Sequence, residues 1–365
     1  RAPVLGFGDV LLAGLADDGG LYVPERWPAL DPALWQEPRP YLEVATEVML
    51  PYVEGTLTRD ELAGMVAEAY ATFEHPDVCP VTPLGDLQLL ELFWGPTLAF
   101  KDVALQLVGR LFDHELTRRG ERATIVVATS GDTGSAAIEA CVGRDTLDIV
   151  VLHPAGRVSD VQRRQMTTVD APNVHNVAVE GTFDDCQDLV KAMFADVAFR
   201  DEVRLAAMNS INWARVMAQV VYYVTTIGRV GPCGFTVPSG NFGNIFAGWV
   251  AERMGAPVGQ LVIASNRNDI LTRWVQDGAM VAEEVVPTLS PAMDIQVSSN
   301  HERLLFELTG RDGARTADLL TRFRGVGAIE APRTDRFDAA RVDDDETLAT
   351  IRAAHAETGV LIDPH

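Results

Sequence analysis

The fold class is decided by residues 124–141, which read TIVVATSGDTGSAAIEAC. Residues 124–128 are an apolar, β-branched run, residues 129–134 are a loop of hydroxyl and glycine residues, and residues 135–141 carry the small side chains of a packed helix. The same order of strand, loop and helix recurs on both sides of this stretch. Strands that alternate with helices predict parallel sheets with crossover helices, which is an α/β architecture.

The other elements are predicted from the same patterns and from capping residues. Thr182 and Asp185 have the spacing of a capping box, which predicts the start of a helix. Further strands are predicted at 147–152, 174–179, 235–237, 261–264 and 360–362, and helices at 59–73, 159–166, 184–195, 244–254, 269–276 and 346–357. Residues 1–80 are rich in proline and glycine turns, and we expect them to form a leading cap domain.

Composition excludes several classes of function. The chain has 365 residues, 47% of them hydrophobic, which is enough for more than one core. Its formal net charge of −22 argues against nucleic acid or anionic lipid as a partner. No run approaches the roughly eighteen apolar residues of a membrane span, and the first twenty residues do not resemble a secretory signal. The four cysteines are scattered without metal-ligand spacing, so we expect reduced thiols, no metal and a cytoplasmic protein.

Lysine is rare in this chain. Of the 30 lysines and arginines, only Lys101 and Lys191 are lysines, and arginine cannot supply the free primary amine of a Schiff base. Lys101 follows the largely apolar run 93–100, a desolvating setting that favours a neutral, nucleophilic amine. Lys191 lies mid-helix near Asp188 and is expected to be an exposed neighbour of that residue. Taken alone, Lys101 is better explained as a lysine whose stem covers apolar surface.

A glycine-rich turn at residues 238–244, PSGNFGN, lies between a predicted strand and a predicted helix. Its glycines let the backbone approach an anion, and the helix N-terminus offers free N–H groups. The turn lacks the Gly-Lys-Ser/Thr ending of a Walker loop, and no G-x-G-x-x-G occurs in the chain. A cradle for the phosphate of a permanently bound cofactor and an ordinary strand-to-helix turn are therefore equally good interpretations.

Two further groups of residues are candidates for binding anions. The hydroxyls and N–H groups of loop 129–135 suit a carboxylate, although such turns are usually only helix caps. Arg163, Arg164 and Arg215 each offer a guanidinium fork for a phosphate. Exposure on a helix surface is the alternative, and it is the better one for Arg163 and Arg164. Other chemistries are not indicated, since neither H-E-x-x-H nor G-x-S-x-G occurs.

Six motifs together resemble threonine synthase, and they occur in the order of that family. They are GPTLAFKD at 95–102, TSGDTG at 129–134, NSINWAR at 209–215, SGNFGN at 239–244, NRND at 266–269 and AMD at 292–294. The match extends from GGLYVP at 19–24 to DPH at 363–365, so it covers essentially the whole chain. Each motif is modest evidence, whereas the ordered set is specific.

The resemblance implies a fold-type II enzyme that binds pyridoxal 5'-phosphate between two α/β domains. The large domain would comprise residues 81–122 and 230–365, and the small substrate-binding domain residues 123–229. Lys101 would be the catalytic, Schiff-base lysine. The implied cofactor-binding residues are Lys101, Gly240, Asn241, Phe242, Gly243 and Asn244, and the implied substrate-binding residues are Thr129, Ser130, Asp132, Thr133 and Arg215.

The activity implied is a carbon–oxygen lyase reaction. O-phospho-L-homoserine and water would give L-threonine and phosphate through β,γ-elimination and β-addition, in a monomer or homodimer. Family chains usually continue past 365 with a small residue that faces the pyridine nitrogen, so that residue is not named. Position 244 is asparagine where some members have aspartate, which we expect to be harmless. Two alternatives stay open: another fold-type II lyase such as threonine dehydratase, and a threonine-synthase-like protein that binds the cofactor without catalysis.

Overall fold

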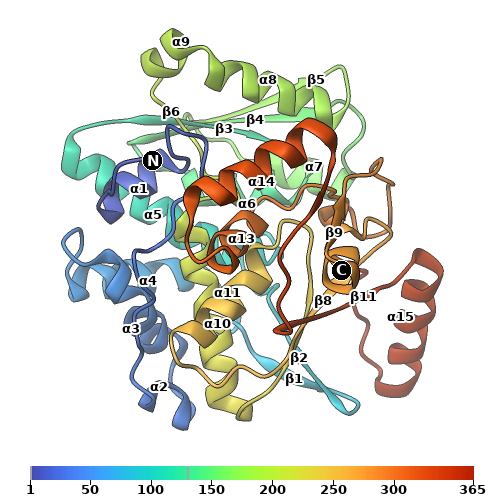
Figure 1. Ribbon diagram of the computed structural model, residues 1–365. Helices are drawn as coiled ribbons and strands as arrows, with labels where there is room; N and C mark the ends of the chain where they lie inside the picture. The colour runs from blue at the N-terminus through green and yellow to red at the C-terminus, as the bar shows by residue number, and fades with distance from the viewer. Residues whose placement is uncertain (1, 130) are drawn as a thin grey trace.

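The computed structural model describes residues 2–129 and 131–365 and confirms an α/β architecture with parallel sheets (Figure 1). One sheet has the order β5-β4-β3-β6 and a second has the order β11-β8-β7, and all their pairings are parallel. The strands of the first sheet are β3 Ala123–Ala128, β4 Leu147–Pro154, β5 Val174–Val179 and β6 Leu205–Ala206. Those of the second are β7 Phe235–Pro238, β8 Leu261–Ser265 and β11 Phe337–Arg341.

Two small antiparallel pairs and a large set of helices complete the described chain. The pairs are β1 Val81–Leu84 with β2 Leu87–Leu90, and β9 Ala279–Val281 with β10 Ala328–Glu330. The helices are α1 Phe7–Ala13, α2 Ala33–Gln36, α3 Tyr41–Val53, α4 Arg59–Tyr70, α5 Lys101–Arg119, α6 Asp132–Cys141, α7 Asp160–Thr167, α8 Phe183–Ala195, α9 Val197–Glu202, α10 Trp213–Val230, α11 Gly243–Arg253, α12 Ile270–Asp277, the 3-10 turn Pro291–Met293, α13 His301–Leu308, α14 Gly313–Val326 and α15 Asp344–Thr358.

Most predicted elements are confirmed where capping or alternation marks them. β5 has the predicted bounds, and α8 begins with the predicted capping box between Thr182 and Asp185. The predicted strand at 360–362 is wrong. In the described chain this segment follows α15 without any strand beside it, and Leu361 is 76% exposed. An apolar run forms a strand only where a neighbouring strand can take its backbone hydrogen bonds.

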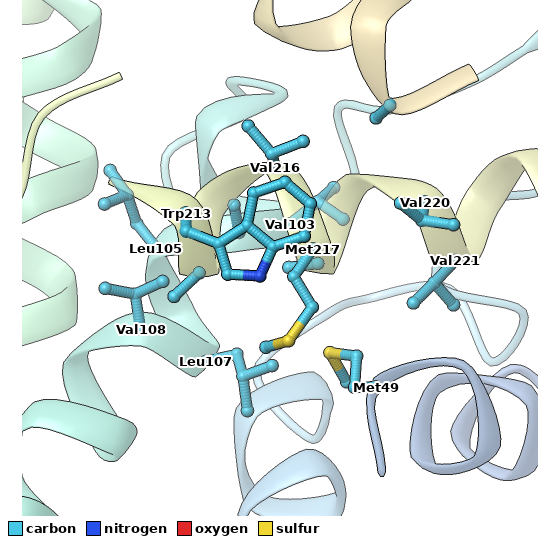
Figure 2. Packing of buried hydrophobic residues seen from close by; sticks show 14 of the residues in the cluster. Met49, Val103, Leu105, Leu107, Val108, Trp213, Val216, Met217, Val220 and Val221 are labelled. Carbon is cyan, nitrogen blue, oxygen red and sulfur yellow. The ribbon is translucent and has the colours of Figure 1, made fainter. Parts of the chain in front are cut away.

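Helix α10 organises the core and was not predicted. Every residue from Trp213 to Ile227 is buried, yet the polar residues Arg215, Gln219 and Thr226 recur along it at helical spacing, so the sequence does carry the signal of this helix. Figure 2 shows its side chains packed with those of α5 and α3; the labelled residues are Met49, Val103, Leu105, Leu107, Val108, Trp213, Val216, Met217, Val220 and Val221. Burial of each such side chain contributes about 1.5–3 kcal/mol. This packing fixes the first turns of α5 and α10, which carry Lys101 and Arg215.

The opening of the chain is attached to α13. The Leu21 N–H donates to Glu302 at 3.0 Å, and Arg303 Nε donates to the Tyr22 carbonyl at 3.0 Å. Arg311 adds a hydrogen bond of 2.6 Å to the Pro24 carbonyl. These contacts join the first residues to the body of the protein, while the division into cap, large and small domains stays a prediction. No helix in the described part of the chain has both the length and the apolar character needed to cross a membrane.

Candidate active site

Lys101 is the first residue of α5 and its side chain is almost fully enclosed. The residue is 9% exposed and forms an ion pair with Asp132. Its ammonium group lies 4.5 Å from the centre of the Phe100 ring. Lys191 also pairs with an aspartate, Asp188, at 2.8 Å, but it lies on the outer surface of α8 with its side chain 71% exposed. The predicted contrast between the two lysines is therefore confirmed.

The turn that precedes Lys101 is held by buried hydrogen bonds. The Thr97 backbone N–H and hydroxyl each donate to the Asp102 carboxylate at 2.8 Å. Burial raises the pKa of Asp102 to about 6, although these Thr97 bonds lower it. Gln165 of α7 donates to the Thr97 carbonyl at 3.0 Å. A Cβ at Gly95 would lie 2.4 Å from the Asp102 Cβ, so only glycine fits there.

The loop after β3 brings Asp132 to Lys101. The Thr129 hydroxyl oxygen accepts from the N–H groups of Gly131 and Gly134, both at 2.9 Å, and so shapes the loop. Asp132 accepts from the Thr133 N–H at 2.7 Å. Burial would raise the pKa of Asp132, but the Lys101 ammonium group and this N–H hold it below its usual value. Ser130, also predicted to bind substrate, lies outside the described residues.

Arg215 is a buried cation that lacks an anionic partner among the described residues. It is 4% exposed, and its Nε has no hydrogen-bond partner in that part of the chain. Burial lowers its pKa to about 10, while the charge of Asp132 acts in the opposite direction. The guanidinium group is thus charged at neutral pH, and a buried charge of this kind calls for a bound anion. Arg163 and Arg164 instead lie toward solvent on α7, as expected.

The glycine turn between β7 and α11 has the form of an anion cradle. A Cβ at Gly240 would lie 3.0 Å from the Ala292 carbonyl oxygen and 2.9 Å from Ile295, so the turn is closely packed. Phe242 takes the left-handed conformation, with φ of 64°, directly before α11. The buried Ser239 hydroxyl has no partner among the described residues. An orphaned hydroxyl beside free N–H groups of a helix start fits a phosphate.

Asn244 is tied to α10 through its side chain. Tyr222 and Tyr223 donate their hydroxyls to Asn244 Oδ1 at 2.5 and 2.9 Å. The side-chain oxygen is thus committed to the protein. That asparagine is harmless at position 244 stays a prediction.

A cluster of hydrogen bonds around Asp294 positions the segment that covers Gly240. Asp294 accepts hydrogen bonds from the side chains of Asn266 at 2.8 Å, Asn268 at 3.0 Å and Thr288 at 2.7 Å. Asn266 and Asn268 follow β8, so the second sheet holds this segment in place. The motifs 266–269 and 292–294 were noticed only through the family resemblance, and this contact gives them a physical role.

The last three residues link the lysine side of the site to the cradle. The Ala292 N–H donates to His365 Nε2 at 3.3 Å, and Ala292 also packs against Gly240. The pKa of Asp363 is lowered by its hydrogen bonds with His365, and the Lys101 ammonium group lowers it further. Asp363 and His365 thus lie near both parts of the site. Neither Asp363, His365 nor Ser239 had been picked as a site residue, although all three belong to the quoted motifs.

His301 is buried below the cradle and gives the protein a pH-dependent stability. Its ring lies 5.2 Å from Phe242 and 4.3 Å from Trp274, measured between ring centres, and neither nitrogen has a partner among the described residues. Burial lowers its pKa from 6.5 to about 3. The imidazole stays neutral in the folded protein but takes up a proton in the unfolded chain below pH 6.5. The free energy of unfolding is therefore unaffected by protonation of His301 above pH 6.5 and decreases as the pH falls toward 3.

We therefore expect His301→Phe to be less sensitive to acid than the parent protein. Between pH 7 and pH 5 the variant should avoid a loss of about 2 kcal/mol of stability. Melting temperatures at the two pH values measure the difference. His355→Phe on exposed α15 is the control and should keep the parent's pH response. An equal fall in melting temperature for the parent and His301→Phe would contradict the assignment.

The described residues fit the cofactor that the resemblance implies. A buried primary amine is available for an aldehyde, and the glycine turn with the orphaned Ser239 hydroxyl is available for a phosphate. Arg215 remains as a second site for an anion. The arrangement thus offers one amine and two separate anion sites, as a phosphorylated substrate and a phosphorylated cofactor require.

Comparison with known proteins identifies the same chemistry. The family described as "Pyridoxal-phosphate dependent enzyme" matches residues 89–365, and "Threonine synthase N terminus" matches residues 1–70. The threonine synthase of Pseudomonas aeruginosa is 52% identical over 379 aligned residues, which cover 100% of this chain and 81% of that protein.

Solved structures agree over the full length. The PLP-bound threonine synthase of Brucella melitensis superposes with a TM-score of 0.96 at 50% identity and covers 100% of this chain and 82% of its own. For yeast threonine synthase the TM-score is 0.93 at 37% identity, with 100% of this chain and 81% of that chain covered. A pyridoxal 5'-phosphate-dependent aspartate racemase shares only the fold, with a TM-score of 0.56, 13% identity and coverage of 85% and 86%.

Proposed function

Since the chain belongs to the threonine synthase family, we propose that it converts O-phospho-L-homoserine and water to L-threonine and phosphate. Its cofactor is pyridoxal 5'-phosphate, which when bound takes up the electrons of a carbanion formed at the substrate. Supporting the substrate assignment are two buried cations that share Asp132 as a neighbour. Lys101 pairs with Asp132, whereas Arg215 has no anionic partner of its own among the described residues.

The cofactor contacts are proposed as follows. The Lys101 amine would hold the aldehyde, since it is the buried primary amine of the chain. The cradle N–H groups and the Ser239 hydroxyl would hold the cofactor's phosphate; the proposed cradle residues are Gly240, Asn241, Phe242, Gly243 and Asn244. Asn244 would act there through its backbone, because Tyr222 and Tyr223 engage its side-chain oxygen.

The substrate contacts divide between two charged groups of the substrate. Arg215 would bind its phosphate in bidentate fashion, and the same residue would stay with the phosphate as it leaves. The loop hydroxyls and N–H groups of Thr129, Ser130 and Thr133 would bind its carboxylate. The Lys101 amine would, once released by the cofactor, take the proton from the α-carbon. The enclosure of Lys101 excludes bulk water, which would otherwise return a proton to the wrong carbon.

A single assay tests the proposed reaction. Cofactor-loaded protein given O-phospho-L-homoserine should release L-threonine and phosphate at equal rates, measured by amino-acid chromatography and a phosphate assay. Unphosphorylated homoserine should not react, because it lacks the group that Arg215 binds. Release of a 2-oxo acid and ammonia in place of threonine would indicate a dehydratase, and absence of both products would indicate a protein that only binds the cofactor.

The remaining assignments are proposals of the same kind. We propose a cap region of residues 1–80, a large domain of 81–122 and 230–365, and a small domain of 123–229. All four cysteines are free thiols, which supports the proposed cytoplasmic location. A monomer or a homodimer is proposed for the assembly.

A further inference from the structure

Asp132 carries a negative charge in a loop whose other groups, hydroxyls and N–H groups, are suited to bind the carboxylate of a substrate. Two ionised carboxylates repel each other, so the Asp132 side chain can meet the substrate only through a cationic group. The structure already shows a cationic partner, the Lys101 ammonium group. The substrate of the proposed reaction is an amino acid and brings a second ammonium group to the same place.

The Asp132 carboxylate is held in a fixed orientation. It belongs to the first residue of α6, where the helix dipole favours negative charge. One oxygen accepts the Thr133 N–H at 2.7 Å, and the other faces Lys101. Arg215 lies close enough to interact electrostatically with Asp132, yet the two form no ion pair among the described residues. The oxygen that is not held by the Thr133 N–H is therefore the one that can bind an ammonium group at the position of the Lys101 amine.

We propose that Asp132 is a positioning residue that holds two amines in turn, the Lys101 ammonium group and the α-ammonium group of the incoming substrate. This inference rests on the proposed function. In the exchange, the substrate nitrogen bonds to the cofactor carbon that the Lys101 nitrogen leaves, so one C–N bond forms as one breaks. The substrate ammonium nitrogen would lose two protons and the Lys101 nitrogen would gain two, so Lys101 would be released as an ammonium group. It would pass one of these protons to solvent before it takes the proton from the α-carbon. Asp132 faces one positive charge before and after the exchange, and no further reactant is needed.

Asp132→Asn in the cofactor-loaded protein tests the inference. Rapid mixing with O-phospho-L-homoserine, followed through the absorbance change as the substrate amine replaces Lys101, should show exchange about 10- to 100-fold slower, the range for loss of one charge-assisted hydrogen bond. The amount of cofactor bound per chain should not change. The matched control is Asp188→Asn, which removes the carboxylate paired with the other lysine, Lys191. It should exchange at the parent's rate.

A second measurement needs neither cofactor nor turnover. The chain has two lysines, so acetylation of Lys101 and Lys191 in cofactor-free protein can be followed separately by mass spectrometry. The Lys101 Nζ donates to the Asp132 carboxylate, and a nitrogen engaged in this way is less free to attack an acetylating reagent. Asp132→Asn should raise the rate of Lys101 acetylation severalfold relative to Lys191, and Asp188→Asn should leave the Lys101 rate unchanged.

The outcomes separate this inference from the proposed function. Slower exchange with unchanged cofactor content and faster Lys101 acetylation would support the role of Asp132. Exchange at the parent's rate, or loss of the cofactor itself in Asp132→Asn, would overturn it. Failure of the parent protein to release threonine, with amine exchange still intact, would instead reject the proposed reaction.

Discussion

Lys101→Ala removes both the colour that the bound cofactor gives the protein and at least about 1,000-fold of its turnover, because one side chain serves as the cofactor's anchor and as the base. The expected loss is large because no other buried lysine is present among the described residues to replace it. Absorbance of the purified protein and the rate of threonine release measure the two effects.

Two further variants separate chemistry from folding. Lys101→Ala leaves the half-buried Asp132 without its ion pair, which lowers stability as well and so obscures the result. Lys101→Arg keeps a cation beside Asp132 but cannot form a Schiff base, and it should be equally colourless and inactive. Lys191→Ala, at an exposed site on α8, should retain colour and turnover. If Lys101→Arg stayed coloured and active, the assignment of the anchoring amine would be wrong.

The fold could be predicted where local patterns are distinct. β5 was found as a short run rich in valine, and α8 because a capping box marks its start. α10 was not predicted, although Arg215, Gln219 and Thr226 recur along it at helical spacing, so a signal for this helix was present in the sequence. The segment 360–362 was predicted as a strand but is not one, because an apolar run alone does not supply the neighbouring strand that would pair with it.

The site was predicted as a set of segments but not as an arrangement. Lys101 was notable because lysine is rare in the chain, and the glycine turn because of its place between strand and helix. Neither signal indicates that Asp132 would face Lys101, or that Ala292 and His365 would join the lysine side to Gly240. Such contacts join residues far apart in sequence, and packing alone determines them. The orphaned atoms of Ser239 and Arg215 likewise become visible only after the hydrogen bonds are counted.

Arg215→Met is expected to change activity and stability in opposite directions. The methionine fills a similar apolar volume but cannot bind the substrate's phosphate, so kcat/KM for O-phospho-L-homoserine should fall at least about 100-fold. The cofactor's colour should remain, because its phosphate is bound by the glycine turn. In ligand-free protein the melting temperature should rise by about 2 °C or more, since the change removes a buried charge that has no anionic partner among the described residues.

A fall in kcat/KM together with a rise in melting temperature would show that this arginine serves the substrate. A residue that supports only the fold would lower stability when replaced, and activity would fall with it. Arg215 is instead expected to cost stability until an anion arrives, and adding phosphate should raise the melting temperature of the parent protein but not of Arg215→Met. Arg164→Met, on the exposed side of α7, is the control and should change neither quantity. A lower melting temperature for Arg215→Met, with turnover retained, would show that the guanidinium group serves the fold and not the substrate.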